Sequence, residues 1–136
     1  MAELIVWKDR YSVGIEGMDQ QHKKLVGLIN ELHDAMQAGR ANEAVVKTLD
    51  GLVSYTLTHF GAEEALLKKS GYPGYEQQRS EHQKLVAQVK ALQQKARAAN
   101  LALSLEVSAF LRNWLIDHIV GVDKQYTAHL KAAGAA

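Results

Sequence analysis

The sequence contains no cysteine, and its 136 residues carry nearly balanced charges, with 16 Lys and Arg against 15 Asp and Glu. Without cysteine, the chain can form neither a disulfide nor a metal site built from thiolates. A net charge of +1 gives no electrostatic footprint for nucleic acid or an anionic membrane surface. No stretch approaches the roughly 20 apolar residues of a membrane span, and the first ten residues do not resemble a signal peptide. We therefore expect a cytoplasmic protein with no nucleic-acid partner and no membrane span.

Apolar residues recur at spacings of three and four in four stretches of the chain, and no run alternates as a strand would. The breaks between the stretches are short and contain helix-ending glycines or the single proline, Pro73. Short connections make successive helices antiparallel. The sequence thus predicts an all-α, up-down-up-down antiparallel four-helix bundle, with helices near residues 19–38, 42–69, 74–98 and 102–131.

The residues before the first helix are too irregular in pattern to belong to it. We expect residues 1–18 to form an N-terminal arm across the bundle of residues 19–131, and Asp19 to cap the first helix at its N-terminus. The length suits one domain, residues 1–136. Four apolar residues are expected to anchor the arm: Val6, Trp7, Tyr11 and Ile15.

Each predicted helix carries one histidine on its apolar stripe, 17 or 18 residues from the turn at the same end of the bundle: His22, His59, His82 and His118. At a rise of 1.5 Å per residue, all four lie about 25–27 Å above that end and point inward. Glu63 lies one turn after His59 on the same face. Asp123 follows His118 by five residues and approaches from the flank, with Gly121 between them as a point of packing or distortion.

A lone histidine on an apolar face is more often a core residue than a ligand. Six inward polar groups at one level are not explained by core packing in the same way. Two buried, unpaired carboxylates would cost several kcal/mol each, and no Lys or Arg points inward at this level. Imidazole ligands suit iron, zinc, copper or cobalt, and two carboxylates among them indicate two metals bridged by Glu63 and Asp123. The chain has neither the Glu-x-x-His pairs of carboxylate-rich di-iron proteins nor the His-Glu-x-x-His motif of zinc proteases.

Four stretches in order resemble the successive motifs of hemerythrins, in particular the single-domain bacteriohemerythrins: "VGIEGMDQQHKKLVGLINELHDAM", "HFGAEE", "GYPGYEQQRSEH" and "WLIDHIVGVDKQY". The resemblance runs from Trp7 to Tyr126. It implies the same bundle and reversible dioxygen binding at a non-haem di-iron centre, for oxygen transport, storage or buffering. It also implies that two iron ions (Fe²⁺/Fe³⁺) are held by His22 and His59 on one side and by His82 and His118 on the other. Glu63, Asp123 and a solvent-derived oxo or hydroxo group would bridge them.

One position departs from the family pattern. Hemerythrins have a fifth histidine four residues before His82, and this chain has Gln78 there. Three outcomes are open: Gln78 ligates through its amide oxygen, a water takes the place of the histidine, or the second iron binds loosely. An amide oxygen is a harder and weaker ligand than imidazole for ferrous iron. We expect the di-iron centre to be retained because the other six ligands are intact.

Reversible oxygen binding requires a dry pocket, because water or added protons would promote irreversible oxidation. Leu115, one turn before His118, is the foremost candidate for its wall, although ordinary core packing explains each candidate equally well. His33 and His129 lie about 16 Å from a ligand histidine and are expected outside the site. The other wall candidates are Trp114, Ile119, Met18 and Phe60.

Three function classes fit these residues. We expect an oxygen-binding protein, not an enzyme, acting as a monomer with dioxygen and with an unidentified oxygen-consuming partner. The alternatives are a di-iron enzyme of the peroxidase or oxidase type, and an oxygen or iron sensor that acts through a partner. Repeated turnover of peroxide would indicate the enzyme, and a reversible spectral change with oxygen would indicate the carrier.

Overall fold

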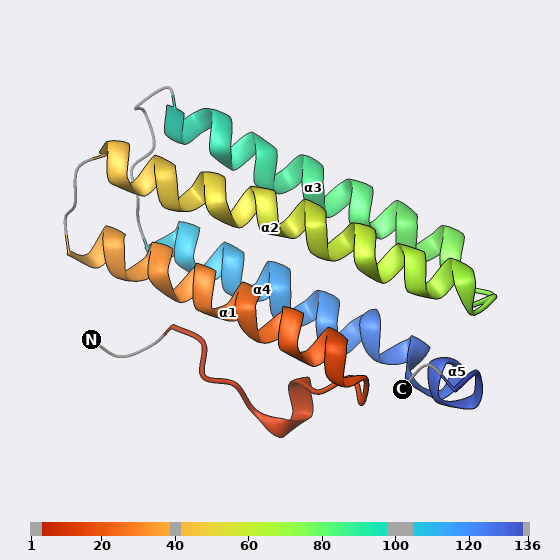
Figure 1. The fold of residues 1–136 in the computed structure, drawn as a ribbon. Helices are drawn as coiled ribbons and strands as arrows, with labels where there is room; N and C mark the ends of the chain where they lie inside the picture. Colours follow the sequence, from red (N-terminus) through yellow and green to blue (C-terminus); the bar gives the residue numbers. More distant parts are fainter. Residues whose placement is uncertain (1–3, 39–41, 98–104, 135–136) are drawn as a thin grey trace.

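The computed structural model describes residues 4–38, 42–97 and 105–134, and in these ranges it is helical without strands. Four long helices run alongside one another in alternating directions (Figure 1). Their bounds are α1 Glu16–Gln37, α2 Asn42–Lys69, α3 Tyr75–Arg97 and α4 Leu105–Gly121. The predicted all-α four-helix bundle is therefore confirmed. No helix in the described ranges is long and apolar enough to cross a membrane.

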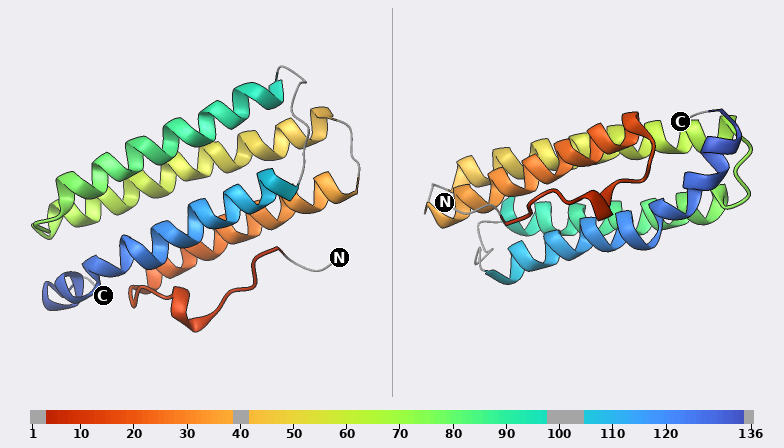
Figure 2. Two further views of the ribbon diagram at one scale, coloured as in Figure 1. Left: turned by 180° about the vertical axis from the view of Figure 1, so that it is seen from behind. Right: turned by 90° about the horizontal axis from the view of Figure 1, so that it is seen from below.

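Two helix pairs form the bundle. In the left view of Figure 2, α3 lies beside α2 and α4 lies beside α1, and α1 also packs against α2. The apolar stripes read from the sequence face one another and fill the interior, which is the arrangement that amphipathic helices require. Among the fully buried side chains are Leu25, Ile29, Leu32, Leu49, Leu52 and Leu111.

The start of the first helix differs from the prediction. The helix begins at Glu16, so Asp19 lies inside its first turn and is not the N-cap. The Asp19 carboxylate instead accepts hydrogen bonds from the Val13 backbone N–H at 2.8 Å and from the Ser12 hydroxyl at 2.5 Å. Asp19 therefore ties the arm to the helix. Between them, Gly14 has a φ of 74°, a conformation that favours glycine.

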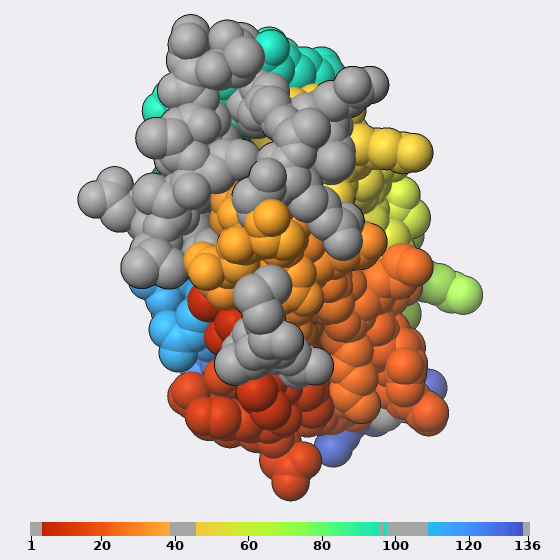
Figure 3. Space-filling view, turned by 90° about the vertical axis from the view of Figure 1, so that its left-hand side faces the viewer, coloured from red at the N-terminus to blue at the C-terminus, as the bar shows by residue number. Residues whose placement is uncertain are grey.

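The arm lies beside α1, as Figure 3 shows from the end of the bundle. Its short 3₁₀ helix η1 (Asp9–Tyr11) touches α4. Tyr11 and Ile15 are buried as predicted, and Trp7 packs against the core. The prediction for Val6 was wrong, because its side chain is 59% exposed while that of Ile5 is 2% exposed. Alternate residues of an extended segment face opposite sides, and Asn30 fixes Ile5 inward through hydrogen bonds to its backbone N–H and C=O.

The fourth helix is not continuous. It ends at Gly121, and a 3₁₀ turn η2 (Asp123–Tyr126) leads into a short helix α5 (Thr127–Ala132) that turns away at the end of the bundle (Figure 1). The predicted helix 102–131 was therefore wrong beyond Gly121, and residues 102–104 lie outside the described ranges. The break follows the mid-helix glycine, whose flexibility lowers the cost of leaving the helix. Its consequence is that the Asp123 carboxylate turns into the bundle.

Candidate metal centre

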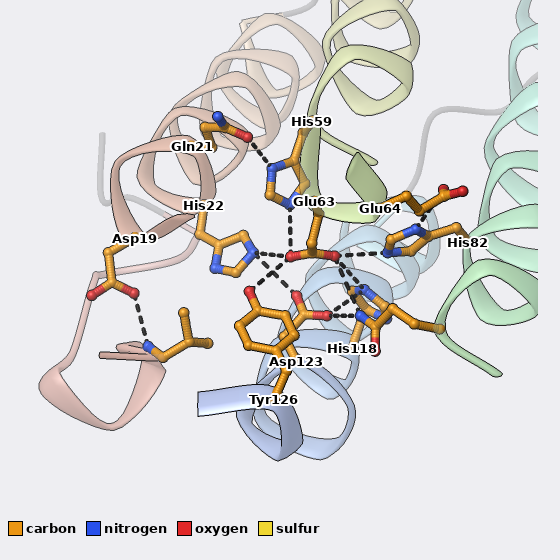
Figure 4. Close-up of polar contacts among 12 residues, drawn as sticks. Asp19, Gln21, His22, His59, Glu63, Glu64, His82, His118, Asp123 and Tyr126 are labelled. Atoms are coloured by element: carbon orange, nitrogen blue, oxygen red, sulfur yellow. Dashed lines mark hydrogen bonds and ion pairs between the residues drawn. The ribbon is translucent and has the colours of Figure 1, made fainter. Parts of the chain in front are cut away.

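Six polar side chains from five elements meet in the middle of the bundle (Figure 4). They come from α1, α2, α3, α4 and η2, and none is more than 5% exposed. Apart from Thr56, which bonds to a carbonyl of its own helix, the buried polar and charged side chains of the described ranges all belong to this cluster or contact it. The six are His22, His59, Glu63, His82, His118 and Asp123.

The cluster divides into two groups that share both carboxylates. In the first, ligand atoms of His22, His59, Glu63 and Asp123 all lie within 4.8 Å of one another, and in the second the same holds for Glu63, His82, His118 and Asp123. A first-row metal ion bonds nitrogen and oxygen at about 2.0–2.2 Å, so its neighbouring ligand atoms lie about 3 Å apart. The two groups are therefore of the size that a metal ion requires.

Each carboxylate presents one oxygen to each group. Glu63 Oε2 lies 3.5 Å from both His22 Nε2 and His59 Nε2, whereas Glu63 Oε1 lies 2.8 Å from His82 Nε2. Asp123 Oδ2 lies 3.1 Å from His22 Nε2, whereas Asp123 Oδ1 lies 2.9 Å from His118 Nε2. Each carboxylate therefore faces both groups, and Figure 4 shows Glu63 at the centre of the cluster.

Several buried atoms of the cluster make no hydrogen bond. An unpaired buried polar atom costs free energy, and a cation held by the Nε2 atoms and the carboxylate oxygen among them would remove that cost for these atoms. The donor set of imidazoles and carboxylates suits a divalent transition metal such as iron. The residues therefore fit a pair of metal ions. The unpaired atoms are His22 Nδ1, His22 Nε2, His59 Nε2, His118 Nδ1, His118 Nε2 and Asp123 Oδ2.

Without a metal ion, the pKa values of the histidines also show that the two buried carboxylates favour positive charge beside them. Burial lowers the pKa of His22, but Asp123 and Glu63 outweigh it and raise that pKa to about 9. Burial likewise opposes a charge on His118, and the same two carboxylates raise its pKa to about 10. Burial lowers the pKa of His59 to about 4. Protons on His22 and His118 therefore supply the positive charge when metal ions do not.

Three residues outside the ligand groups hold them in place. Gln21 Oε1 accepts a hydrogen bond from His59 Nδ1 at 2.6 Å, and Glu64 Oε2 accepts one from His82 Nδ1 at 2.9 Å. Each contact places the proton on Nδ1 and leaves Nε2 free to face the centre. The Tyr126 hydroxyl donates to Glu63 Oε2 at 2.9 Å. These roles were not predicted from the sequence, although Gln21 and Glu64 are sequence neighbours of ligand candidates.

Gln78 lies on α3 one turn before His82, and its side chain is 2% exposed. Its amide nitrogen donates to Asp123 Oδ1 at 2.5 Å and to Glu63 Oε1 at 3.3 Å. The amide therefore contacts the two oxygens that face the second group.

The five predicted wall residues are all buried. Phe60 stacks on the His82 ring with centroids 3.9 Å apart and lies 5.5 Å from the His118 ring. Trp114 lies 6.4 Å from Phe60 and donates its indole N–H to the Leu85 carbonyl. The other three, Met18, Leu115 and Ile119, have exposures of 6%, 2% and 0%. Their role in an oxygen pocket stays a prediction.

The two remaining histidines were expected away from the cluster. His129 lies on α5 and donates from Nε2 to the Ser70 carbonyl at 2.8 Å, next to the Tyr72 ring. His33 lies on α1, three turns beyond His22. Neither belongs to the two ligand groups found among the described residues.

Comparison with known proteins agrees with this geometry. The family described as "Hemerythrin HHE cation binding domain" matches residues 13–130. The chain is 35% identical to a bacteriohemerythrin of Methylococcus capsulatus over 130 residues, covering 95% of this chain and 98% of the relative. It is 29% identical to a myohemerythrin of Riftia pachyptila over 92% of each chain. A crystal structure of wild-type hemerythrin superposes with a TM-score of 0.88 at 33% identity, covering 98% of this chain and 99% of that one.

Proposed function

The chain belongs to the hemerythrin family, and from that premise we propose that it binds dioxygen reversibly at a non-haem di-iron centre, for oxygen transport, storage or buffering. The observation that carries the proposal is the pair of ligand groups that share Glu63 and Asp123. That sharing supports two metal ions bridged by two carboxylates. We further propose that the chain acts as a monomeric single domain, as a binding protein and not as an enzyme.

The ligands of each ion are those whose atoms lie close together in one of the two groups. His22 and His59 would hold one iron, and His82 and His118 would hold the other. Glu63 and Asp123 would bridge them together with a solvent-derived oxygen. When bound, the two iron ions supply the electrons that reversible dioxygen binding needs.

The chain's own residues orient the ligands and keep water away. Gln21 and Glu64 fix the orientation of two imidazoles, and Tyr126 fixes one oxygen of Glu63. Phe60 packs against the rings of His82 and His118, and buried apolar side chains such as Leu115 would complete the wall around the cluster. Such exclusion of water protects a ferrous centre from irreversible oxidation.

The proposal is tested by loading the metal-free protein with ferrous iron under nitrogen, counting bound iron and recording optical spectra through cycles of oxygen and nitrogen. We expect two irons per chain and a spectral change that reverses in each cycle. His59→Gln should lower the iron content and abolish the reversible change. The matched variant His129→Gln changes a histidine outside the cluster and should behave as wild type.

Two results would contradict the proposal. Iron binding well below two per chain would remove the di-iron centre. Catalytic consumption of many equivalents of hydrogen peroxide per iron, without a reversible oxygen spectrum, would favour the enzyme over the carrier. The same reconstituted sample serves both measurements.

A further inference from the structure

We propose that the metal position beside His82 and His118 keeps a coordination place open to a small external ligand, because Gln78 binds the bridging carboxylates and not the metal. This inference rests on the di-iron centre proposed above. It concerns the second metal position, defined by Glu63, His82, His118 and Asp123.

The contacts of Gln78 are those of a hydrogen-bond donor. Its amide nitrogen lies 2.5 Å from Asp123 Oδ1 and 3.3 Å from Glu63 Oε1. These two oxygens are the ones that also face His118 Nε2 at 2.9 Å and His82 Nε2 at 2.8 Å. A carboxylate oxygen has two lone pairs, so each oxygen can accept a bond from the amide and still bind a metal ion.

Ligation through the amide oxygen would require Gln78 to turn over. The oxygen would then face the carboxylate oxygens at the distances that the nitrogen now has, and two hydrogen bonds to charged acceptors would be lost. Hydrogen bonds to charged groups are the stronger ones in proteins, whereas a neutral amide oxygen is a poor substitute for imidazole on ferrous iron. The arrangement in which the Gln78 amide donates to the carboxylates is therefore more stable than ligation through its oxygen. The second metal position then has two imidazoles and two carboxylate oxygens from the protein.

Access from solvent is available on this side of the cluster. A cleft of about 80 Å³ is lined by Gln78, Val122 and Gln125, and the amide of the same Gln78 side chain bonds Asp123. A second cleft of about 380 Å³ reaches His118 itself. The exposures agree: His118 is 5% exposed, whereas His22 and His59 are both 0% exposed.

Charge defines the ligand class. Two ferrous ions bring four positive charges against the two negative charges of Glu63 and Asp123, so the loaded centre attracts a small anion. Glu81 lines both clefts, and its negative charge opposes an anion there. The metal position held by His22 and His59 has the same number of protein ligands, two imidazoles and two carboxylate oxygens, and so has an open place as well. We therefore infer a second site for a small anion such as azide, weaker than the one beside His22 and His59.

The test is an azide titration of the ferric, two-iron protein, followed by calorimetry and by the optical charge-transfer band. Wild type should bind two azides per chain in two steps of different affinity. Gln78→Ala should also bind two, because the amide is not a ligand. Gln78→His, which supplies an imidazole at this position, should bind one.

A variant that removes the negative charge of Glu81, which lines both clefts, can show that the weaker azide-binding step takes place there. Glu81→Gln should tighten the weaker step about twofold, the effect of removing one partly screened charge at close range, and should leave the stronger step unchanged. Glu31→Gln removes an exposed charge nine residues beyond His22 on α1 and should change neither step.

The outcomes separate this inference from the proposed function. A wild type with two irons that binds one azide, combined with a Gln78→Ala variant that binds two, would show that Gln78 is a ligand and would overturn the inference. A single azide in both proteins would also overturn it. An iron count below two in wild type would instead overturn the proposed function. If Gln78→His does not load two irons, the wild type and Gln78→Ala still decide.

Discussion

Tyr126→Phe removes the hydroxyl that donates a hydrogen bond to the central carboxylate, Glu63. Tyr126 and Glu63 are both 0% exposed, and the hydroxyl donates to Glu63 Oε2 at 2.9 Å. Burial, together with the charges of Glu63 and Asp123, raises the pKa of Tyr126, so the phenol remains a donor at neutral pH. Glu63 remains ionised, since its pKa is held well below its usual value: burial opposes the charge, and the imidazoles of His118, His22 and His82 outweigh it.

The loss of stability caused by Tyr126→Phe depends on which other groups neutralise the charge of Glu63. A hydrogen bond to a charged group contributes about 1.5–3 kcal/mol, and an ordinary one about 0.5–1.5 kcal/mol. In the metal-free protein we expect Tyr126→Phe to lower the free energy of unfolding by about 1.5–3 kcal/mol. In the iron-loaded protein the cations share the charge of Glu63, so the loss should fall to about 0.5–1.5 kcal/mol.

Urea unfolding of both forms measures these losses. Tyr11→Phe is the matched control, because Tyr11 is 3% exposed and its hydroxyl contacts Arg10 at 3.3 Å, away from the cluster. Tyr11→Phe should lower the free energy of unfolding by at most about 1 kcal/mol, and by the same amount in the metal-free and the iron-loaded protein. If Tyr126→Phe behaves like this control, or if its loss is unchanged by iron, the phenol does not stabilise a buried charge at Glu63 and the reasoning fails.

Two further predictions concern the pocket and the protons. Leu115→Ala should speed autoxidation of the oxygen-loaded protein by admitting water. Leu32→Ala, which changes an equally buried leucine on α1, should lower the free energy of unfolding by about 2–5 kcal/mol, as Leu115→Ala does, without speeding autoxidation. Equal autoxidation rates in the two variants would remove Leu115 from the wall. His22 and His118, with pKa values of about 9 and about 10, are protonated at pH 7 without metal, so their contribution to stability is complete below pH 6.5 and is lost as the pH rises through 9 to 10. Iron uptake at pH 7 should therefore release about two protons per chain, measured by calorimetry in buffers of different ionisation enthalpy, and metal uptake without proton release would contradict this.

The helices were predictable because their apolar residues keep the helical period over long stretches. The bounds of α2 agree with the prediction, and α3 begins one residue later than predicted. Its predicted last residue, 98, lies outside the described ranges. The break after α4 was not predictable, since the apolar series continues through Val122 and Tyr126 as if the helix did. Gly121 signalled some distortion, but the 3₁₀ turn depends on tertiary contacts, such as the hydrogen bond from Thr127 to the Val13 carbonyl.

The ligand candidates could be predicted because equal distances from the turns place residues at equal heights. The structure brings all six together within two groups. The contacts of Gln21 and Glu64 could not be read in the same way, because a helix surface carries many polar residues and only the packing shows which ones reach an imidazole. The donor role of Gln78 likewise depends on where Asp123 lies after the break.

The most direct measurement is diffraction at the iron absorption edge from crystals of the protein loaded with ferrous iron under nitrogen. The account predicts two anomalous peaks, one within bonding distance of His22 and His59 and the other within bonding distance of His82 and His118, with Glu63 and Asp123 contacting both. A single peak, or peaks outside the cluster, would contradict it.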